Sequence, residues 1–366
     1  MKILVDGHLF DDNIHQGTRT YLRGLYNDLV NFCPEITFYF ACSNFEYIRS
    51  EIPIRQNVEY LKLRFKNKVI RLLLEFSYLI IRHKIDYAHF QYIAPVFKFS
   101  KEILTVHDLL FLDFPEYFPL QYRLIKNFLF KRSARRAEIL LTVSEYSKQA
   151  IARHYKIKLQ NIHVTPNGVS PSLIQRVNAT SKRNFLAKYG LEKFILFVSR
   201  IEPRKNHINL LRAFAELKLW KEYDLVFVGK RSIEVHELDE FWKQQNPELR
   251  SRVKHYESVS DEDLAHFYST CSLFVFPSFA EGFGIPPIEA VLFKAKVLCS
   301  NQTAMSDFVF LGDHLFNPNN YEEMKSRIVD QLQSDGNSAS LTFFKEYVLQ
   351  KYSWEYSAQT LKSWLT

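Results

Sequence analysis

Residues 278–290, Ser278-Phe-Ala-Glu281-Gly-Phe-Gly-Ile-Pro-Pro-Ile-Glu289-Ala, decide the fold that we predict for this chain. An apolar run over 273–276 precedes them and is typical of a buried parallel strand. Glycines and prolines then break regular structure, and 288–293 has the pattern of a helix with proline at its first positions. A strand, a glycine-bearing turn and a helix start together present backbone N–H groups to an anion. Because Glu281 and Glu289 cannot themselves bind phosphate, they indicate a ligand with hydroxyl groups beside its phosphates.

The composition is that of a folded protein of about two domains. The chain has 366 residues, of which 47% are hydrophobic, and no low-complexity tract. The apolar run in residues 1–7 is too short for a signal peptide and predicts a first strand. The most apolar later segment, 69–81, contains Arg71 and Glu75 and falls short of the roughly 18 apolar residues of a spanning helix. We therefore expect a soluble, cytoplasmic protein.

The cysteines and the net charge limit the classes of ligand and partner that the chain could bind. The four cysteines are scattered and form no Cys-x-x-Cys pair, so we expect reduced thiols and neither a metal site nor a disulfide framework. The net charge of +8 indicates an anionic partner: nucleic acid, an acidic lipid surface or a phosphorylated substrate. The basic residues are dispersed and no nucleic-acid recognition motif is present, so nucleic acid is disfavoured.

Short apolar runs alternate with helical patterns in both halves of the chain. The expected strands are 2–5, 37–42, 58–63, 87–90, 103–106, 139–143, 162–165, 194–198, 224–228, 253–256, 273–276 and 297–299. From 169 to about 181 the pattern lapses into Ser, Pro, Asn and Thr, which predicts a linker. Repeated β-α alternation on both sides predicts an α/β protein with two doubly wound parallel-sheet domains.

Polar residues follow the ends of many expected strands. Asp6-Gly7, His107-Asp108 and Ser144 do so in the first half, and Ser199-Arg200 and Gly229-Lys230 in the second. In open α/β sheets the ligand lies outside the carboxyl ends of the strands, so two facing rims predict one interdomain cleft. A sugar-contacting role for His107 and a hydrogen-bonded core histidine are both compatible with this position.

The stretch 195–206 supplies cations beside the opening motif. Asn206 is expected to cap a helix at 208–217, which puts Lys205 at a positive helix end, where a cation is unfavourable unless an anion binds. Arg200 offers a planar fork and Lys205 a point charge, a pair suited to a diphosphate. With the phosphates so bound, Glu281 and Glu289 would hold sugar and ribose hydroxyls. The alternatives are a solvated basic loop and, for Glu289, a helix-dipole role.

Gly17 and the basic helix at 122–137 each have two possible roles. Gly17 either eases a loop at 16–19 or lets a phosphate approach its backbone. The basic helix at 122–137 either presents a solvated face or attaches to an acidic membrane surface.

Taken together, these motifs resemble the signatures of the family 4 retaining glycosyltransferases, which have the GT-B fold. The most specific are Ser199-Arg200 through Lys205-Asn206 and Pro277 through Ala290. Supporting matches are Thr105-Val-His107-Asp108, Thr142-Val-Ser144-Glu-Tyr-Ser, Pro166-Asn-Gly-Val, Val226-Phe-Val-Gly229-Lys and Ser353-Trp354. The likeness spans nearly the whole chain and fades between about 45 and 100.

The resemblance implies two doubly wound, Rossmann-like domains that face a central cleft. It implies an N-terminal acceptor-side domain at 1–170, a donor-binding domain at 171–349, and a C-terminal helix at 350–366 that packs back on the first domain. The N-terminal loop has one glycine where many relatives have two, and no role is assigned within 304–307.

The resemblance also implies roles for single residues. Arg200 and Lys205 would hold the donor diphosphate, Glu289 the ribose hydroxyls and Glu281 the transferred sugar. His107 would contact that sugar from the other domain. The remaining donor contacts would be backbone groups of Gly17, Gly282, Phe283, Gly284 and Ile285. No cofactor or metal is expected, because the two fixed cations can do the electrostatic work that a metal does elsewhere.

The expected activity is retaining transfer of a hexose from a nucleoside diphosphate sugar. UDP-sugars such as UDP-glucose are favoured over GDP-sugars, and the acceptor would be an oligosaccharide or lipid-linked glycan at the inner face of the cell membrane. The alternatives are a nucleotide-sugar epimerase or phosphorylase of the same fold, and a non-catalytic carbohydrate- or membrane-binding module. A dinucleotide oxidoreductase is disfavoured because no Gly-x-Gly-x-x-Gly follows the first strand.

Overall fold

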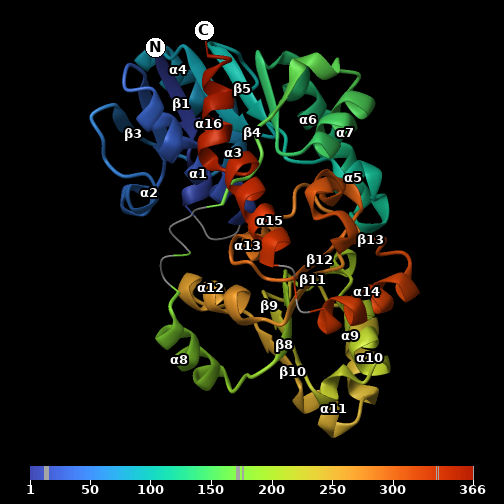
Figure 1. Ribbon diagram of the computed structural model, residues 1–366. Helices are drawn as coiled ribbons and strands as arrows, with labels where there is room; N and C mark the ends of the chain where they lie inside the picture. The colour runs from blue at the N-terminus through green and yellow to red at the C-terminus, as the bar shows by residue number, and fades with distance from the viewer. Residues whose placement is uncertain (12–15, 170–173, 175–176, 335, 337, 366) are drawn as a thin grey trace. The chain divides into compact units, whose positions relative to one another are not determined.

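The computed structural model describes residues 1–11, 16–169, 174, 177–334, 336 and 338–365. The chain divides into two compact units, Met1–Gly168 with Ser353–Thr366, and Val169–Tyr352. Each unit is built on its own parallel sheet (Figure 1). The cleft expected between the two halves stays a prediction.

Unit 1 contains, in its described residues, a seven-stranded sheet in the order β3-β2-β1-β4-β5-β6-β7. Its strands are β1 (Lys2–Asp6), β2 (Thr37–Cys42), β3 (Val58–Lys62), β4 (Tyr87–Gln91), β5 (Lys101–Thr105), β6 (Ile139–Thr142) and β7 (Ile162–Val164). Every strand pair is parallel. The order reverses between β1 and β4, and in a doubly wound sheet ligands bind at the carboxyl ends of the strands at that point.

Helices cover both faces of this sheet. They are α1 (Gln16–Phe32), α2 (Phe45–Glu51), α3 (Lys68–Ile70), a π-helical segment (Arg71–Glu75), α4 (Phe76–His83), α5 (Leu110–Asp113), α6 (Leu120–Arg136), α7 (Glu145–Tyr155) and α16 (Trp354–Lys362). Alternate strand residues such as Phe90 pack in one buried cluster with Phe76 of α4 and Phe130 of α6. On the opposite face, His89 bonds to Tyr26 of α1. Short 3₁₀ turns lie at His8–Phe10, Pro115–Tyr117 and Leu159–Asn161.

Unit 2 contains, in its described residues, a six-stranded sheet in the order β10-β9-β8-β11-β12-β13. Its strands are β8 (Phe194–Val198), β9 (Asp224–Val228), β10 (Val253–Tyr256), β11 (Leu273–Phe276), β12 (Val297–Ser300) and β13 (Leu315–Phe316). All pairs are again parallel, and the order reverses between β8 and β11. This reversal brings the ends of β8 and β11 together, where the two most specific motifs begin.

The helices of unit 2 are α8 (Ala179–Tyr189), α9 (His207–Glu216), α10 (His236–Gln244), α11 (Pro247–Ser251), α12 (Asp261–Thr270), α13 (Ile285–Leu292), α14 (Tyr321–Gln333) and α15 (Ser338–Lys351). Its 3₁₀ turns are Pro203–Lys205, Leu219–Lys221, Thr303–Asp307 and Val309–His314.

Several local expectations differ from the structure. Residues 16–19, expected as a loop, form the start of α1. The expected linker ends in α8, because Asn178 and Ser181 form a reciprocal capping box at its start, while 170–173 and 175–176 lie outside the described residues. The helical pattern at 340–366 splits into α15 and α16, since Ser353 accepts a hydrogen bond from the Tyr356 N–H and caps a new helix.

No helix within the described residues is both long and apolar enough to span a bilayer.

Helix α16 lies against α1 within unit 1 (Figure 1). The contact depends on a glycine, because a Cβ added at Gly24 would lie 2.1 Å from the Trp354 ring. Ser357 of α16 also donates a hydrogen bond to the Pro166 carbonyl, 2.6 Å away.

We predict that Gly24→Ala lowers the free energy of unfolding by about 1–3 kcal/mol, because the methyl group overpacks the α1–α16 contact. Urea unfolding followed by circular dichroism measures the change. Gly17→Ala on the same helix is the matched control, because an added Cβ there meets no atom within 4 Å in the part of the chain that the structure describes. Equal stability of the two variants would contradict the packing described.

Candidate functional site

The turn between β11 and α13 has the predicted strand–turn–helix form. Gly284 is the residue before the helix and has a left-handed backbone with φ of +104°, and proline lies in the first helical turn. The Phe283 side chain is buried, with its ring centroid 5.8 Å from that of Phe308 and 5.7 Å from that of Tyr352. Pro286 and Pro287 in the first turn of α13 have no N–H, so the backbone N–H groups that an anion can meet there are those of Gly284 and Ile285.

Glu281 is buried in this turn and bound by cations. Its carboxylate forms ion pairs with Lys205 and, at 3.1 Å, with Nη1 of Arg204. Its backbone N–H donates to the Thr303 hydroxyl at 2.9 Å. Lys205 and Arg204 therefore occupy the carboxylate that was expected to hold sugar hydroxyls, and that role of Glu281 stays a prediction.

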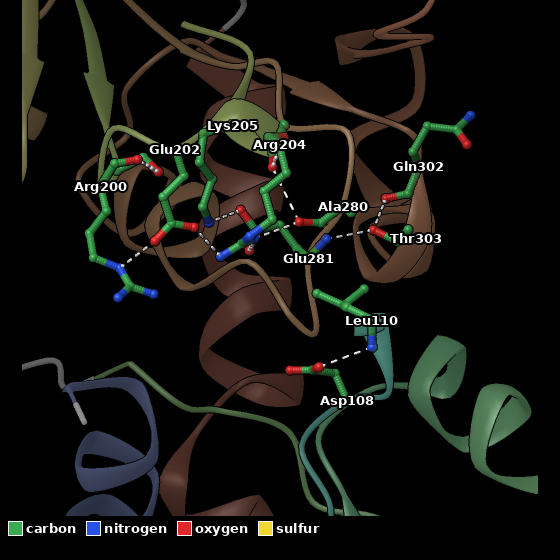
Figure 2. Close-up of polar contacts among 12 residues, drawn as sticks. Asp108, Leu110, Arg200, Glu202, Arg204, Lys205, Ala280, Glu281, Gln302 and Thr303 are labelled. Carbon is green, nitrogen blue, oxygen red and sulfur yellow. Dashed lines mark hydrogen bonds and ion pairs between the residues drawn. The ribbon is translucent and has the colours of Figure 1, made fainter. Parts of the chain in front are cut away.

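Arg204 bridges two carboxylates (Figure 2). Nη2 lies 3.0 Å from Glu202 Oε2, while Nη1 contacts Glu281 and donates to the Ala280 carbonyl at 2.7 Å. Arg200 joins the network through Nε, 3.2 Å from Glu202 Oε1. The Arg200 side chain is 54% exposed, whereas the other charged members are at most 14% exposed.

This network has three cations and two carboxylates, so it keeps one positive charge in excess. Burial and the charge of Arg204 lower the pKa of Lys205 to about 8, against the opposing effect of Glu281. Burial alone would raise the pKa of Glu281, but Lys205 and Arg204 hold it below its usual value. At neutral pH both groups are therefore charged, and an arriving anion would raise the pKa of Lys205.

Backbone contacts join the loops that follow β8 and β11. The Phe279 N–H donates to the Arg204 carbonyl at 2.8 Å. Asn206 precedes α9 but does not cap it, contrary to expectation. Its backbone is left-handed, with φ of +63°, and its amide instead donates to the Pro277 carbonyl at 3.1 Å.

Gly229, which follows β9, allows the loop that carries Arg200 to pack closely against it. A Cβ at Gly229 would lie 2.3 Å from the Ser199 carbonyl oxygen, and Gly229 has φ of +140°. The Ile201 N–H donates to the Lys230 carbonyl at 2.9 Å. Only glycine allows the two loops to approach this closely.

Glu289 lies in α13, half-buried, and accepts a hydrogen bond of 2.8 Å from the hydroxyl of Tyr268 in α12. Burial and the Glu289 carboxylate raise the pKa of Tyr268, which therefore stays a donor. This contact fixes the orientation of the carboxylate.

His107 lies in unit 1 immediately beyond β5 and is buried. Its Nε2 is 2.7 Å from the Gln91 side-chain oxygen, and its ring is edge-on to Tyr21 at 5.0 Å. Burial lowers the pKa of His107 to about 3, so the ring is neutral at physiological pH. With the Gln91 amide in this orientation, its oxygen accepts a hydrogen bond from the Nε2–H of His107. Nδ1 is then an acceptor.

Gly17 lies in the first turn of α1, so the loop expected at 16–19 is wrong, while a contact of the Gly17 backbone with phosphate stays a prediction. An added Cβ at Gly17 would meet no atom of the described residues within 4 Å. Asp108 accepts a hydrogen bond from the Leu110 N–H at 3.1 Å and begins the turn into α5 (Figure 2).

Glu202, Arg204 and Gln91 contact the candidate site residues but were not predicted from the sequence. Glu202 and Arg204 stand between Arg200 and Lys205, and their alternating charges were a usable signal of internal pairing. Gln91 ends β4, which pairs with the strand that leads to His107. His107 was selected because it follows the carboxyl end of a parallel strand, and Gln91 lies at such an end too.

Both halves of the chain match glycosyltransferase family models. Residues 16–173 match the model described as Glycosyltransferase Family 4, and 178–342 match the model described as Glycosyl transferases group 1. O-antigen chain mannosyltransferase B of Escherichia coli is 30% identical over 279 residues, which are 74% of this chain and 72% of that protein. O-antigen chain mannosyltransferase RfbU of Salmonella typhimurium is 29% identical, with 72% and 69% covered.

Solved structures share the fold over almost the full length. Anabaena Alr3699/HepE in complex with UDP-glucose matches with a TM-score of 0.74 at 17% identity, covering 99% of this chain and 98% of that one. The lipopolysaccharide glycosyltransferase WaaG matches with a TM-score of 0.69 at 14% identity, covering 100% and 98%. The fold is therefore GT-B, and the chain belongs to family 4 of the glycosyltransferases.

Proposed function

We propose that this glycosyltransferase moves a hexose from a nucleoside diphosphate sugar to a glycan or lipid-linked acceptor, with retention of anomeric configuration. The observation that carries the proposal is the cationic excess after β8 and β11. Arg200 is exposed there, Lys205 has a lowered pKa, and a helix begins beside them. A diphosphate supplies the negative charge that this network lacks.

In this proposal Arg200 and Lys205 neutralise the charge that develops on the leaving diphosphate, and Arg204 fixes Lys205 and Glu281. Two fixed cations then supply the stabilisation that a metal supplies elsewhere, so the reaction is proposed to be metal-independent. Glu281 is a poor candidate nucleophile, because two cations hold its carboxylate and lower its pKa. Its role is to orient the cations and, through the turn, the sugar.

Two of the relatives are named O-antigen mannosyltransferases, which supports mannose as the transferred hexose. A structural neighbour is described in complex with UDP-glucose, which supports a nucleoside diphosphate donor. His107, as a neutral ring with an accepting Nδ1, is proposed to bind a sugar hydroxyl rather than to titrate.

The helix α6 supports peripheral membrane contact. Leu120, Leu124 and Phe128 share one face at a spacing of four residues and are 63%, 63% and 70% exposed. A solvated helix face would expose charge instead, whereas an apolar face that also carries Lys131 suits the surface of an acidic bilayer. We propose that the enzyme works at the inner surface of the cell membrane.

We expect one nucleoside diphosphate hexose in a panel of GDP-mannose, UDP-glucose and ADP-glucose to bind the protein and raise its melting temperature.

For the donor found in this way, Arg200→Met should weaken binding roughly 10- to 100-fold, because a charge-assisted hydrogen bond contributes about 1.5–3 kcal/mol. Calorimetry gives the affinities, and Arg212→Met is the matched control, since Arg212 forms a 2.8 Å ion pair with Glu237 on another surface of unit 2. Unchanged donor affinity in Arg200→Met would refute the role of Arg200 in binding the diphosphate. A product whose anomeric configuration is inverted relative to the donor, as seen by NMR, would refute retention.

The pKa of Lys205 sets a pH dependence. Its ammonium is charged below about pH 8 and loses its proton above, so donor affinity should fall as pH rises from 7 to 9. Lys205→Arg keeps its charge over this range and should bind with little change. A flat affinity in the unaltered protein, or the same fall in Lys205→Arg, would exclude titration of Lys205 as the cause.

Vesicle sedimentation tests the membrane proposal. Phe128→Ser with Leu124→Ser should lose most binding to vesicles with 30% phosphatidylglycerol, because the apolar face no longer inserts. Phe343→Ser is the control, since Phe343 is 55% exposed on α15 in unit 2. Equal binding of both proteins would count against α6 as the contact.

A further inference from the structure

The carboxyl edge of the unit 1 sheet holds a second group of cations that the proposed donor site does not use. They are Lys68 at the start of α3, Arg71 in the π-helical segment and Lys126 in α6. Helices that follow parallel strands begin at the carboxyl edge, which places Lys68 and Arg71 on the side of the sheet where ligands bind. Lys126 lies close enough to Lys68 for their charges to repel each other. We call them the unit 1 cation cluster.

Arg71 is the buried member. It is only 8% exposed, and its Nε has no hydrogen-bond partner in the part of the chain that the structure describes. A buried N–H of a charged group without an acceptor destabilises the folded state, so an arriving acceptor would be favoured there. The π-helical form at Arg71–Glu75 is a rare geometry that recurs at functional sites.

Asp6 at the end of β1 compensates only part of this charge. Burial alone would raise its pKa, but His8 and Arg71 hold the pKa below its usual value. Its Oδ1 is already engaged by His8, with Nδ1 at 2.7 Å and the backbone N–H at 3.2 Å. Asp6 therefore cannot neutralise the whole cluster.

The cations act on one another. Partial removal of the Lys68 ammonium from water, together with the charges of Lys126 and Arg71, lowers the pKa of Lys68, although much of its side chain is exposed. Lys126 Nζ lies 5.7 Å from the Phe130 ring, and Phe130 stacks on Tyr92 at 4.7 Å. The Tyr92 ring is 5.4 Å from that of His107, so the cluster adjoins the proposed sugar contact of unit 1.

We propose that the unit 1 cation cluster binds a phosphate or diphosphate group of the acceptor. The proposal rests on the proposed function, in which the one diphosphate of the donor is held by unit 2. A second cationic cluster then needs a second anion. The exposed apolar residues Val69 and Ile125 are the chain neighbours of Lys68 and Lys126, which suits a phosphate that carries a lipid chain.

The test measures binding of octyl diphosphate by calorimetry, with octyl glucoside as the uncharged ligand of equal chain length. Arg71→Met and the double variant Lys68→Met/Lys126→Met should each weaken octyl diphosphate binding at least tenfold and leave donor affinity unchanged. The double variant keeps the test decisive if Arg71→Met fails to fold. Lys101→Met is the matched control, because Lys101 begins β5 at the opposite edge of the same sheet.

Unchanged octyl diphosphate affinity in the double variant would overturn the proposal. So would a loss of donor affinity with octyl diphosphate binding intact, because the cluster would then serve the donor. Equal binding of octyl glucoside and octyl diphosphate would show a site for the chain alone and would also overturn it. Failure of the proposed function is a separate result, namely that the unaltered protein binds no sugar nucleotide.

Discussion

The bridge that Arg204 forms between Glu202 and Glu281 is the interaction on which the proposed donor site depends. Charges taken out of water are costly unless each is paired, and removing one partner leaves the others buried without compensation. The bridge therefore ties the loop after β8 to the turn after β11. It also holds Lys205 in a position where burial lowers its pKa but Glu281 keeps it charged at neutral pH.

The two units offer different chemistry at the carboxyl edges of their sheets. Unit 2 presents a network with one excess positive charge, shaped by close backbone contacts such as that of Gly229 with Ser199. Unit 1 presents the neutral ring of His107, oriented by Gln91, beside a cation cluster that Asp6 only partly compensates. A polar neutral group suits a sugar. The cations of unit 2 suit the donor diphosphate, and those of unit 1 suit the phosphate proposed for the acceptor.

The elements were largely predictable from the sequence because hydrophobic periodicity and turn residues are local. The apolar run before Pro277 is a fully buried strand, and Ser144 caps α7 as expected. The ion pair of Lys205 with Glu281 was not predictable, because the two residues lie 76 positions apart in the sequence and meet only when β8 and β11 pair. The same holds for Asn206, whose capping role was lost to a tertiary hydrogen bond with Pro277.

NMR of lysine side chains labelled with ¹⁵N can show whether the unit 2 cations receive the donor diphosphate. Lys205 can be assigned by the signal that disappears in Lys205→Arg. We expect this ammonium to titrate near pH 8 in the unliganded protein and its pKa to rise when the sugar nucleotide saturates the site. A lysine that titrates at its ordinary value of about 10.4 and does not move on donor binding would contradict this expectation.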